Sequence, residues 1–229
     1  MGNGVMDLDT DNLWAEGFAV LPKLLDARQC EAIRAMYADE DRFRSRIDMK
    51  RYRFGQGEYQ YFAHPLPELV DSLRLSLYES LTPTAREWMT ALSAGAEFPD
   101  TLPEFLKQCH EAGQERPTPL LLRYRQGDYN CLHQDLYGKL FFPFQVVIGL
   151  SRPGVEYTGG ELLLVEQQPR AQSIGRVVPL DQGDGVVIAT RYRPARSTRG
   201  FYRANVRHGV GAIRSGERFT LGLIFHDAE

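Results

Sequence analysis

The sequence predicts an α+β fold, with N-terminal helices packed on a jelly-roll core of short antiparallel strands. Apolar residues recur at helical spacing in the first half of the chain, whereas short apolar runs alternate with turns in the second half. Candidate metal ligands at His133 and His208 lie far apart in the sequence, and a jelly roll would bring them together. With 229 residues, 43% of them hydrophobic, the chain can bury one sizeable core. We therefore expect a single domain, residues 1–229, in which residues 1–114 are mainly helical support and residues 115–229 form the jelly-roll core.

Three segments of the first half are predicted to be helical. Apolar side chains recur at the spacing of one helix face in residues 26–38, 66–92 and 101–112. Asp26 is a candidate N-cap for the first of these helices, because its short side chain can accept from the backbone N–H groups of the first turn. Glycines and prolines between the first two helices predict a loop or hairpin around Gly55-Gln56-Gly57.

From Pro119 onward, short apolar runs are predicted to be strands. Turns rich in glycine and aspartate separate them, as at Gly159-Gly160 and Gly183-Asp184-Gly185. The predicted strands are residues 120–124, 144–150, 161–166, 175–180, 185–190, 204–210 and 218–226. Many short strands at this spacing are typical of a sandwich or barrel.

Composition narrows the class of protein. No apolar run approaches membrane-spanning length, and residues 1–7 lack the charged and apolar segments that begin a signal peptide. Cys30, Cys109 and Cys131 are odd in number and widely spaced, which argues against a disulfide framework and fits a reducing compartment. We therefore expect a cytoplasmic protein without a membrane partner. The net charge of −3 gives no general affinity for nucleic acid.

His133, Gln134 and Asp135, with His208 downstream, form the pattern H-x-D…H. Two imidazoles and one carboxylate on a single face of a metal ion leave the other coordination positions open, an arrangement that suits Fe(II) in oxygenases. His133 and Asp135 are two residues apart on an expected strand, so their side chains should point the same way while Gln134 faces elsewhere. We expect His133, Asp135 and His208 to bind a metal ion. The alternative is a buried histidine and a surface aspartate without a ligand role.

The strand predicted at 218–226 supplies a candidate anion site. Phe219 and Leu221 alternate with Arg218 and Thr220, which therefore share the opposite face. A guanidinium group holds a carboxylate in a fixed orientation, and a neighbouring hydroxyl can supply a further hydrogen bond. The candidate anion is the distal carboxylate of 2-oxoglutarate. The alternative for Arg218 is a structural ion pair with Asp or Glu.

Two stretches of the chain combine arginines with aromatic residues. One runs from Arg42 to Phe62, and the other runs from Arg191 to Arg207 with no acidic residue among them. Basic groups mixed with aromatics can clamp phosphates and stack bases, although a run of charges is more often a solvated surface. Both stretches could rim the mouth of a metal site. Residues 42–62, with their glycines as hinges, are also a candidate substrate lid.

Several motifs of the second half resemble the iron-site segments of the Fe(II)/2-oxoglutarate-dependent dioxygenases, whose core is a double-stranded β-helix. The motifs are Leu122-Arg123-Tyr124, Leu132-His133-Gln134-Asp135, Gly159-Gly160-Glu161, Gly183-Asp184-Gly185, His208 and Arg218-x-Thr220. The whole chain is similar to a bacterial oxygenase family described as acting oxidatively on damaged, methylated DNA. The resemblance implies that Fe(II) is the cofactor, that 2-oxoglutarate and O2 are co-substrates, and that ascorbate is a candidate reductant. It also implies that Tyr124 hydrogen-bonds the co-substrate; a half-buried strand tyrosine is the alternative.

The chain departs from the alkylation-repair branch of these dioxygenases at two places. Leu122 stands where that branch usually has an asparagine, two residues before the tyrosine equivalent to Tyr124. Arg218 follows His208 by ten residues, a spacing closer to that of hydroxylases of small molecules and proteins. The resemblance therefore supports the iron and co-substrate chemistry more strongly than it supports a nucleic-acid substrate.

We expect an oxidoreductase that couples oxidative decarboxylation of 2-oxoglutarate to succinate and CO2 with hydroxylation of a C–H bond. On an N-methylated base of DNA or RNA, the hydroxymethyl product would collapse to formaldehyde, which makes the reaction a demethylation in DNA repair. One alternative is hydroxylation of a small molecule or a protein side chain. Another is a non-catalytic, cupin-like module that binds a metal or ligand. The sequence leaves the oligomeric state open.

Overall fold

A computed structural model describes residues 8–95 and 97–229. Residues 1–7, on which the expected absence of a signal peptide rests, lie outside the described residues. The helices are α1 (Thr10–Glu16), α2 (Ala27–Ala35), α3 (Met49–Tyr52), α4 (Glu68–Ala91) and α5 (Leu102–Glu111), with 3-10 turns η1 (Met36–Ala38) and η2 (Glu40–Arg42). In the described part of the chain, none of these helices has the length and apolar character needed to cross a membrane.

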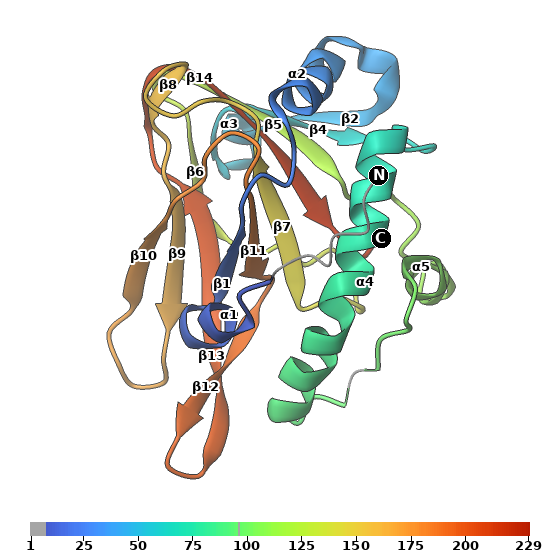
Figure 1. Cartoon of the computed structure of the whole chain (residues 1–229), viewed down its shortest axis with the longest axis vertical. Helices are drawn as coiled ribbons and strands as arrows, with labels where there is room; N and C mark the ends of the chain where they lie inside the picture. The colour runs from blue at the N-terminus through green and yellow to red at the C-terminus, as the bar shows by residue number, and fades with distance from the viewer. Residues whose placement is uncertain (1–7, 96) are drawn as a thin grey trace.

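The strands form two antiparallel sheets, as the predicted jelly roll requires (Figure 1). The larger sheet has the order β1-β11-β7-β14-β5-β4-β2, with β8 added on β14, and the smaller has the order β10-β9-β13-β6-β3, with β12 added on β13. The strands of the first half are β1 (Phe18–Leu21), β2 (Phe43–Asp48), β3 (Gly55–Gln56) and β4 (Glu58–Phe62). Those of the second half are β5 (Leu120–Arg125), β6 (Tyr129–His133), β7 (Phe144–Gly149), β8 (Tyr157–Gly159), β9 (Leu162–Gln167), β10 (Ile174–Val178), β11 (Gly185–Ala189), β12 (Tyr192–Ser197), β13 (Gly200–Val210) and β14 (Ile213–Ile224).

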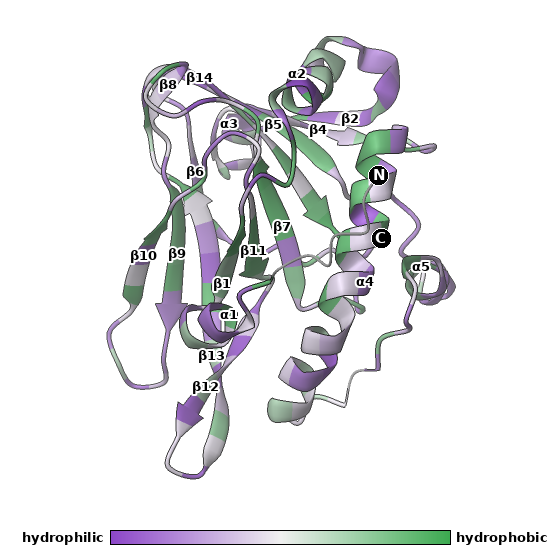
Figure 2. Ribbon diagram, in the orientation of Figure 1, coloured by the Kyte–Doolittle hydropathy of each residue, from purple (hydrophilic) through white to green (hydrophobic). Residues whose placement is uncertain are grey.

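The three predicted helices are confirmed, and local chemistry explains where they begin. Asp26 caps α2: its Oδ1 accepts from the Gln29 backbone N–H at 2.8 Å, and the Gln29 side chain accepts from the Asp26 N–H at 2.9 Å. The long helix α4 packs on the larger sheet, where the Trp88 ring lies 4.9 Å from that of Phe144 on β7. In Figure 2, β1 and β11 are green along their length, whereas β12 and β13 carry purple segments. The apolar strand β11 is buried at every residue, because removing apolar surface from water is favourable.

Strands also arise in the first half of the chain, where the sequence predicted mainly helices. β1 pairs with β11, β4 pairs with β5, and β3 pairs with β6. Residues 43–62 are therefore hydrogen-bonded into both sheets, and Met49 between them is fully buried. This pairing argues against a freely hinged lid and makes the segment a wall of the fold. The proposed division at residue 114 stays a prediction.

Candidate metal centre

His133 and His208 are brought together by strand pairing. His133 is the last residue of β6, and it lies directly opposite His208 of β13 in the antiparallel register. Residues opposite one another on paired strands share a face, and the two imidazole rings are 4.3 Å apart between centroids. The double-stranded core thus joins two ligands that are distant in the sequence.

Asp135 completes the cluster from a loop. We expected it on a strand, but β6 ends at His133 and Asp135 lies beyond that end. Its Oδ2 is 3.1 Å from Nε2 of His208, and its Oδ1 is 3.6 Å from Nε2 of His133. One ligand atom from each of the three residues lies within 4.8 Å of the others. The geometry fits two nitrogens and one oxygen around a single ion.

Neighbouring groups orient each of the three side chains. Nδ1–H of His133 donates to the Cys131 carbonyl at 2.8 Å, which turns Nε2 toward the centre of the cluster. The side-chain amide of Gln145 lies 3.5 Å from Nδ1 of His208. The Tyr137 hydroxyl donates to Oδ1 of Asp135 at 2.6 Å and accepts from the Tyr61 hydroxyl at 3.0 Å.

The pKa shifts of His133 and Asp135 suit a metal ion, which needs a neutral imidazole from the first residue and an ionised carboxylate from the second. Burial lowers the pKa of His133, and the nearby His208 lowers it further. Burial by itself would raise the pKa of Asp135, but the adjacent His133, His208 and Tyr137 outweigh it and hold that pKa well below its usual range. The cluster is therefore poised to bind a cation at neutral pH.

Arg218 and Thr220 share one face of β14, as predicted, and line the same cavity as the three ligands. This cavity has a volume of about 310 Å³. Arg218 is only 1% exposed, and its guanidinium lies over the Tyr124 ring, 5.6 Å from the centroid. Nε and Nη1 of Arg218 have no hydrogen-bond partner, and the group forms no ion pair, among the described residues. The alternative of a structural ion pair for Arg218 is thus not found.

Tyr124 is fully buried against Arg218, not half-buried as its alternative reading required. Its hydroxyl accepts from Nδ2 of Asn130 at 3.3 Å. Burial raises the pKa of Tyr124, so the phenol keeps its proton and can donate it to a ligand. Arg218, Thr220 and Tyr124 form a second polar group of the cavity beside the three metal-ligand candidates.

The cavity wall between these groups is mostly apolar, and its mouth carries aromatic and basic residues. The apolar lining includes Leu120, Leu122, Val147, Leu162 and Val210, and the mouth includes Arg53, Phe54, Tyr59 and Leu132. The first basic-aromatic stretch therefore reaches the mouth. The second does not: among the described residues, no side chain of 191–207 lines this cavity. Cys131 also lines this cavity and is exposed.

Sequence reasoning missed four residues that shape the site. Gln145 carried a signal, because it is a lone polar residue in the apolar run 144–150 and is buried. Tyr137 follows Asp135 closely enough to be suspected. Tyr61 and Asn130 carried no local signal, since only strand pairing brings them near the cavity.

Solved structures with a similar fold are known. The fold is similar to that of a Pseudomonas putida prolyl-4-hydroxylase, with a TM-score of 0.56, 17% identity, and 96% of each chain covered. It is equally similar to an oxidoreductase of the 2-oxoglutarate-Fe(II) oxygenase family from Burkholderia pseudomallei, with a TM-score of 0.56, 17% identity, and coverage of 100% of this chain and 93% of the other. The predicted α+β fold with a jelly-roll core is confirmed.

The family is shown by sequence. Residues 57–228 match the family model described as "Oxygenase, catalysing oxidative methylation of damaged DNA", and the chain belongs to this oxygenase family. An uncharacterized protein of Mycobacterium tuberculosis is 54% identical over 167 residues, which are 73% of this chain and 72% of that protein. The expectation of an oxidoreductase is confirmed, and the non-catalytic module loses its support.

Proposed function

We propose that this protein is an Fe(II)- and 2-oxoglutarate-dependent dioxygenase that oxidises a methylated or otherwise damaged DNA base. The observation that carries the co-substrate is the buried guanidinium of Arg218, whose Nε and Nη1 lack partners among the described residues. A buried charge without a counter-ion is costly, so a site that keeps one is built for an anionic ligand. Arg218 lies in the same cavity as the His-Asp-His cluster. One dicarboxylate could therefore reach both groups.

The donor set fits Fe(II). His133, Asp135 and His208 would hold the ion through two nitrogens and one oxygen, which leaves positions for co-substrate and O2. A structural zinc site would need a closed set of four ligands, usually with thiolates, and the cluster found in the described residues has three and no cysteine. Arg218 would bind the far carboxylate of 2-oxoglutarate, with Thr220 and Tyr124 as further hydrogen-bonding groups.

The bound iron, 2-oxoglutarate and O2 would together supply oxidative decarboxylation to succinate and CO2, coupled to hydroxylation of a substrate C–H bond. The protein positions the metal ligands and shields the reacting centre from water. Tyr137 and the Cys131 carbonyl fix two of the ligands in orientation. The apolar wall formed by residues such as Leu122 and Val147 keeps water from the reacting centre.

A flat, partly apolar substrate suits the mouth of the cavity. Phe54 lines it and is 49% exposed, and its ring stacks on that of Tyr52 at 5.7 Å with 18° between planes. Exposed aromatic rings bind nucleobases by stacking, and the neighbouring Arg51 and Arg53 could contact phosphates. The family description names damaged DNA, which agrees with this surface. Hydroxylation of a small molecule or a protein side chain is the competing outcome.

The co-substrate assignment is tested by anaerobic titration of Fe(II)-loaded protein with 2-oxoglutarate, following the weak visible charge-transfer band of the chelate. We expect the band in wild type and a need for far more 2-oxoglutarate in Arg218→Ala. The substrate is tested by succinate formation from 2-oxoglutarate in the presence of single-stranded DNA with one N-methylated base, a free peptide or a free methylated nucleoside. Formaldehyde release is measured as well for the two methylated substrates. No band in folded, iron-loaded protein would refute the dioxygenase, whereas a band with turnover of the peptide alone would refute only the DNA substrate.

A further inference from the structure

The strands β12 and β13 form a basic ribbon outside the metal cavity, at one end of the molecule (Figure 1). Tyr192 pairs with Asn205 and Arg196 pairs with Phe201, so Tyr192, Arg196, Phe201 and Arg203 lie on one face of the ribbon. The Arg203 guanidinium lies 5.8 Å from the Tyr192 ring centroid, and that of Arg196 lies 5.8 Å from the Phe201 centroid. This face, the arginine ribbon, is a row of guanidinium groups held against aromatic rings.

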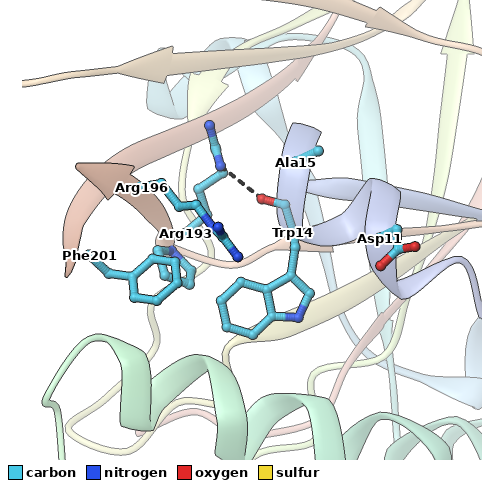
Figure 3. Close-up of a pocket in the computed structure, with 7 residues that line it drawn as sticks. Asp11, Trp14, Ala15, Arg193, Arg196 and Phe201 are labelled. Carbon is cyan, nitrogen blue, oxygen red and sulfur yellow. Dashed lines mark hydrogen bonds between the residues drawn. The ribbon is translucent and has the colours of Figure 1, made fainter. Parts of the chain in front are cut away.

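Arg196 and Arg203 on this face have no acidic partner among the described residues, although Nη2 of Arg203 donates to the Leu92 carbonyl at 3.5 Å. Arg193 on the other face does have an acidic partner. Arg193 is buried, donates to Glu166 through Nε and Nη2, and donates to the Trp14 carbonyl at 2.9 Å, the bond drawn in Figure 3. Figure 3 also shows Arg196 and Phe201 beside Trp14 at the edge of a hollow. In the described part of the chain, Arg196 and Arg203 form no ion pair.

A groove beside the ribbon collects further positive charge. It has a volume of about 540 Å³ and lies between the C-terminal end of α4 and the start of β12. Its lining includes Lys139, Arg191, Tyr192 and Arg203, with Glu97 as an acidic member. No acidic residue occurs between Asp184 and Glu217, although the whole chain carries a net charge of −3. The positive charge is thus concentrated at this groove and ribbon.

The groove adjoins the metal-binding loop. Gln134, between two of the ligand candidates, lines the metal cavity, and its Nε2 donates to the Arg191 carbonyl at 3.1 Å and to Oδ1 of Asn205 at 2.7 Å. From His208 the strand β13 runs seven residues back to Phe201, about 23 Å at about 3.3 Å per residue. The arginine ribbon therefore leads away from the reacting centre over a defined length.

We infer that the groove and the arginine ribbon bind the phosphate backbone of the DNA strand whose damaged base enters the metal cavity. The inference rests on the proposed function. The guanidinium groups of Arg196 and Arg203, which have no ion pair among the described residues, match the negative charges of a polyanion. Phe201, 40% exposed, offers a ring for stacking. A distance of about 23 Å corresponds to about seven nucleotide steps at about 3.4 Å each. A stacked strand of about that length, measured from the damaged base, would reach Arg196.

The test compares two lengths of DNA in the full-length protein. Fluorescence anisotropy measures binding of fluorescein-labelled oligothymidine of 20 and of 5 nucleotides across a range of salt concentrations. We expect Arg196→Gln/Arg203→Gln to bind the longer probe roughly tenfold more weakly, with a salt slope reduced by about 1.4, and to bind the shorter probe like wild type. Arg196→Lys/Arg203→Lys keeps both charges and should keep most of the affinity.

The matched control is Arg28→Gln/Arg214→Gln, which removes the same charge from exposed positions elsewhere. An equal loss in the control, an equal loss for both probe lengths, or competition by polyglutamate as strong as by DNA would overturn the inference. The 2-oxoglutarate charge-transfer band is recorded for the same samples. If the 2-oxoglutarate band is normal and Arg196→Gln/Arg203→Gln binds DNA like wild type, the DNA-binding role of the ribbon is refuted and the dioxygenase proposal is not. DNA binding lost in that variant, with no band in wild type, supports the ribbon and refutes the dioxygenase.

Discussion

Two buried polar clusters in this molecule are built from the same residue types but arrange their charges in opposite ways. The Arg74 cluster, formed by Arg74, Thr118 and Asp227, closes on itself. Nη2 of Arg74 donates to Oδ1 of Asp227 at 2.9 Å, and Nε donates to the Ile224 carbonyl at 2.9 Å. The Thr118 hydroxyl bonds to the His226 carbonyl. Every charge in this cluster has a partner, so the cluster holds α4 against the end of β14.

The metal cavity also contains an arginine, an aspartate and a threonine, but among the described residues these three side chains form no hydrogen bond or ion pair with one another. Asp135 bonds to the histidines and to Tyr137, whereas Arg218 keeps two N–H groups without partners among the described residues. Arg74 and Arg218 are each 1% exposed, so burial does not distinguish them. The partners do. A buried charge that has partners is compensated within the fold, and a buried charge that lacks them indicates a ligand.

The largest expected contrast is between the two aspartates. Asp135→Ala removes one of the three proposed ligands, and we expect Fe(II) affinity to fall by more than about 100-fold, beyond the range seen for neighbours of ligands. Asp227→Ala leaves Arg74 buried without its counter-ion, which should lower the free energy of unfolding by about 3–5 kcal/mol. Competition with a chromophoric chelator measures the first effect, and urea unfolding measures the second. Loss of iron in Asp227→Ala at a temperature where it is folded would contradict the contrast.

The two arginines should respond with opposite signs. Arg218→Met removes an unpaired buried charge, so we expect a melting temperature above wild type in the ligand-free protein, by about 2–4 °C per kcal/mol gained. The same variant should bind 2-oxoglutarate roughly 100-fold more weakly, because about 3 kcal/mol of charged hydrogen bonding is lost. Arg74→Met leaves Asp227 buried without its counter-ion, so this variant should have a melting temperature well below that of wild type. Calorimetry measures the melting temperatures of both variants. A melting temperature of Arg218→Met below that of wild type would contradict the ligand role of Arg218.

The sequence predicted those features of the two clusters that depend on the local spacing of apolar and polar residues. Alternation along β14 placed Arg218 and Thr220 on one face, and helical spacing with the Asp26 cap placed α2 and α4. It did not reveal that Arg74, one polar residue on a predicted helix, is buried, because its partner Asp227 comes 153 residues later. It also put Asp135 on a strand, since no local rule shows that β6 ends at His133.

Tyr137 provides a smaller contrast, because it acts on the metal through Asp135. Tyr137→Phe removes the hydrogen bond to Oδ1 of Asp135, and we expect Fe(II) affinity to fall about 10-fold while the fold is kept. Tyr78→Phe is the matched control, because the Tyr78 hydroxyl donates to the Pro99 carbonyl and Tyr78 does not line the cavity. Chelator competition and the position of the 2-oxoglutarate charge-transfer band report the effect. Equal iron affinity in Tyr137→Phe and wild type would show that the bond does not position the carboxylate.

The smallest contrast is between two threonines, and it tests whether the cavity hydroxyl works for the fold or for the ligand. Thr220→Val keeps the shape of the side chain but removes a donor near Arg218, so 2-oxoglutarate should bind about fivefold more weakly, equivalent to about 1 kcal/mol. The ligand-free protein should lose little stability, because no hydrogen bond of the Thr220 hydroxyl occurs among the described residues. Thr118→Val should do the reverse, lowering the free energy of unfolding by about 1–3 kcal/mol while leaving 2-oxoglutarate affinity intact, since its hydroxyl is bonded inside the Arg74 cluster. If both variants lose stability equally and neither changes co-substrate affinity, Thr220 is a structural residue and Arg218 binds the carboxylate without it.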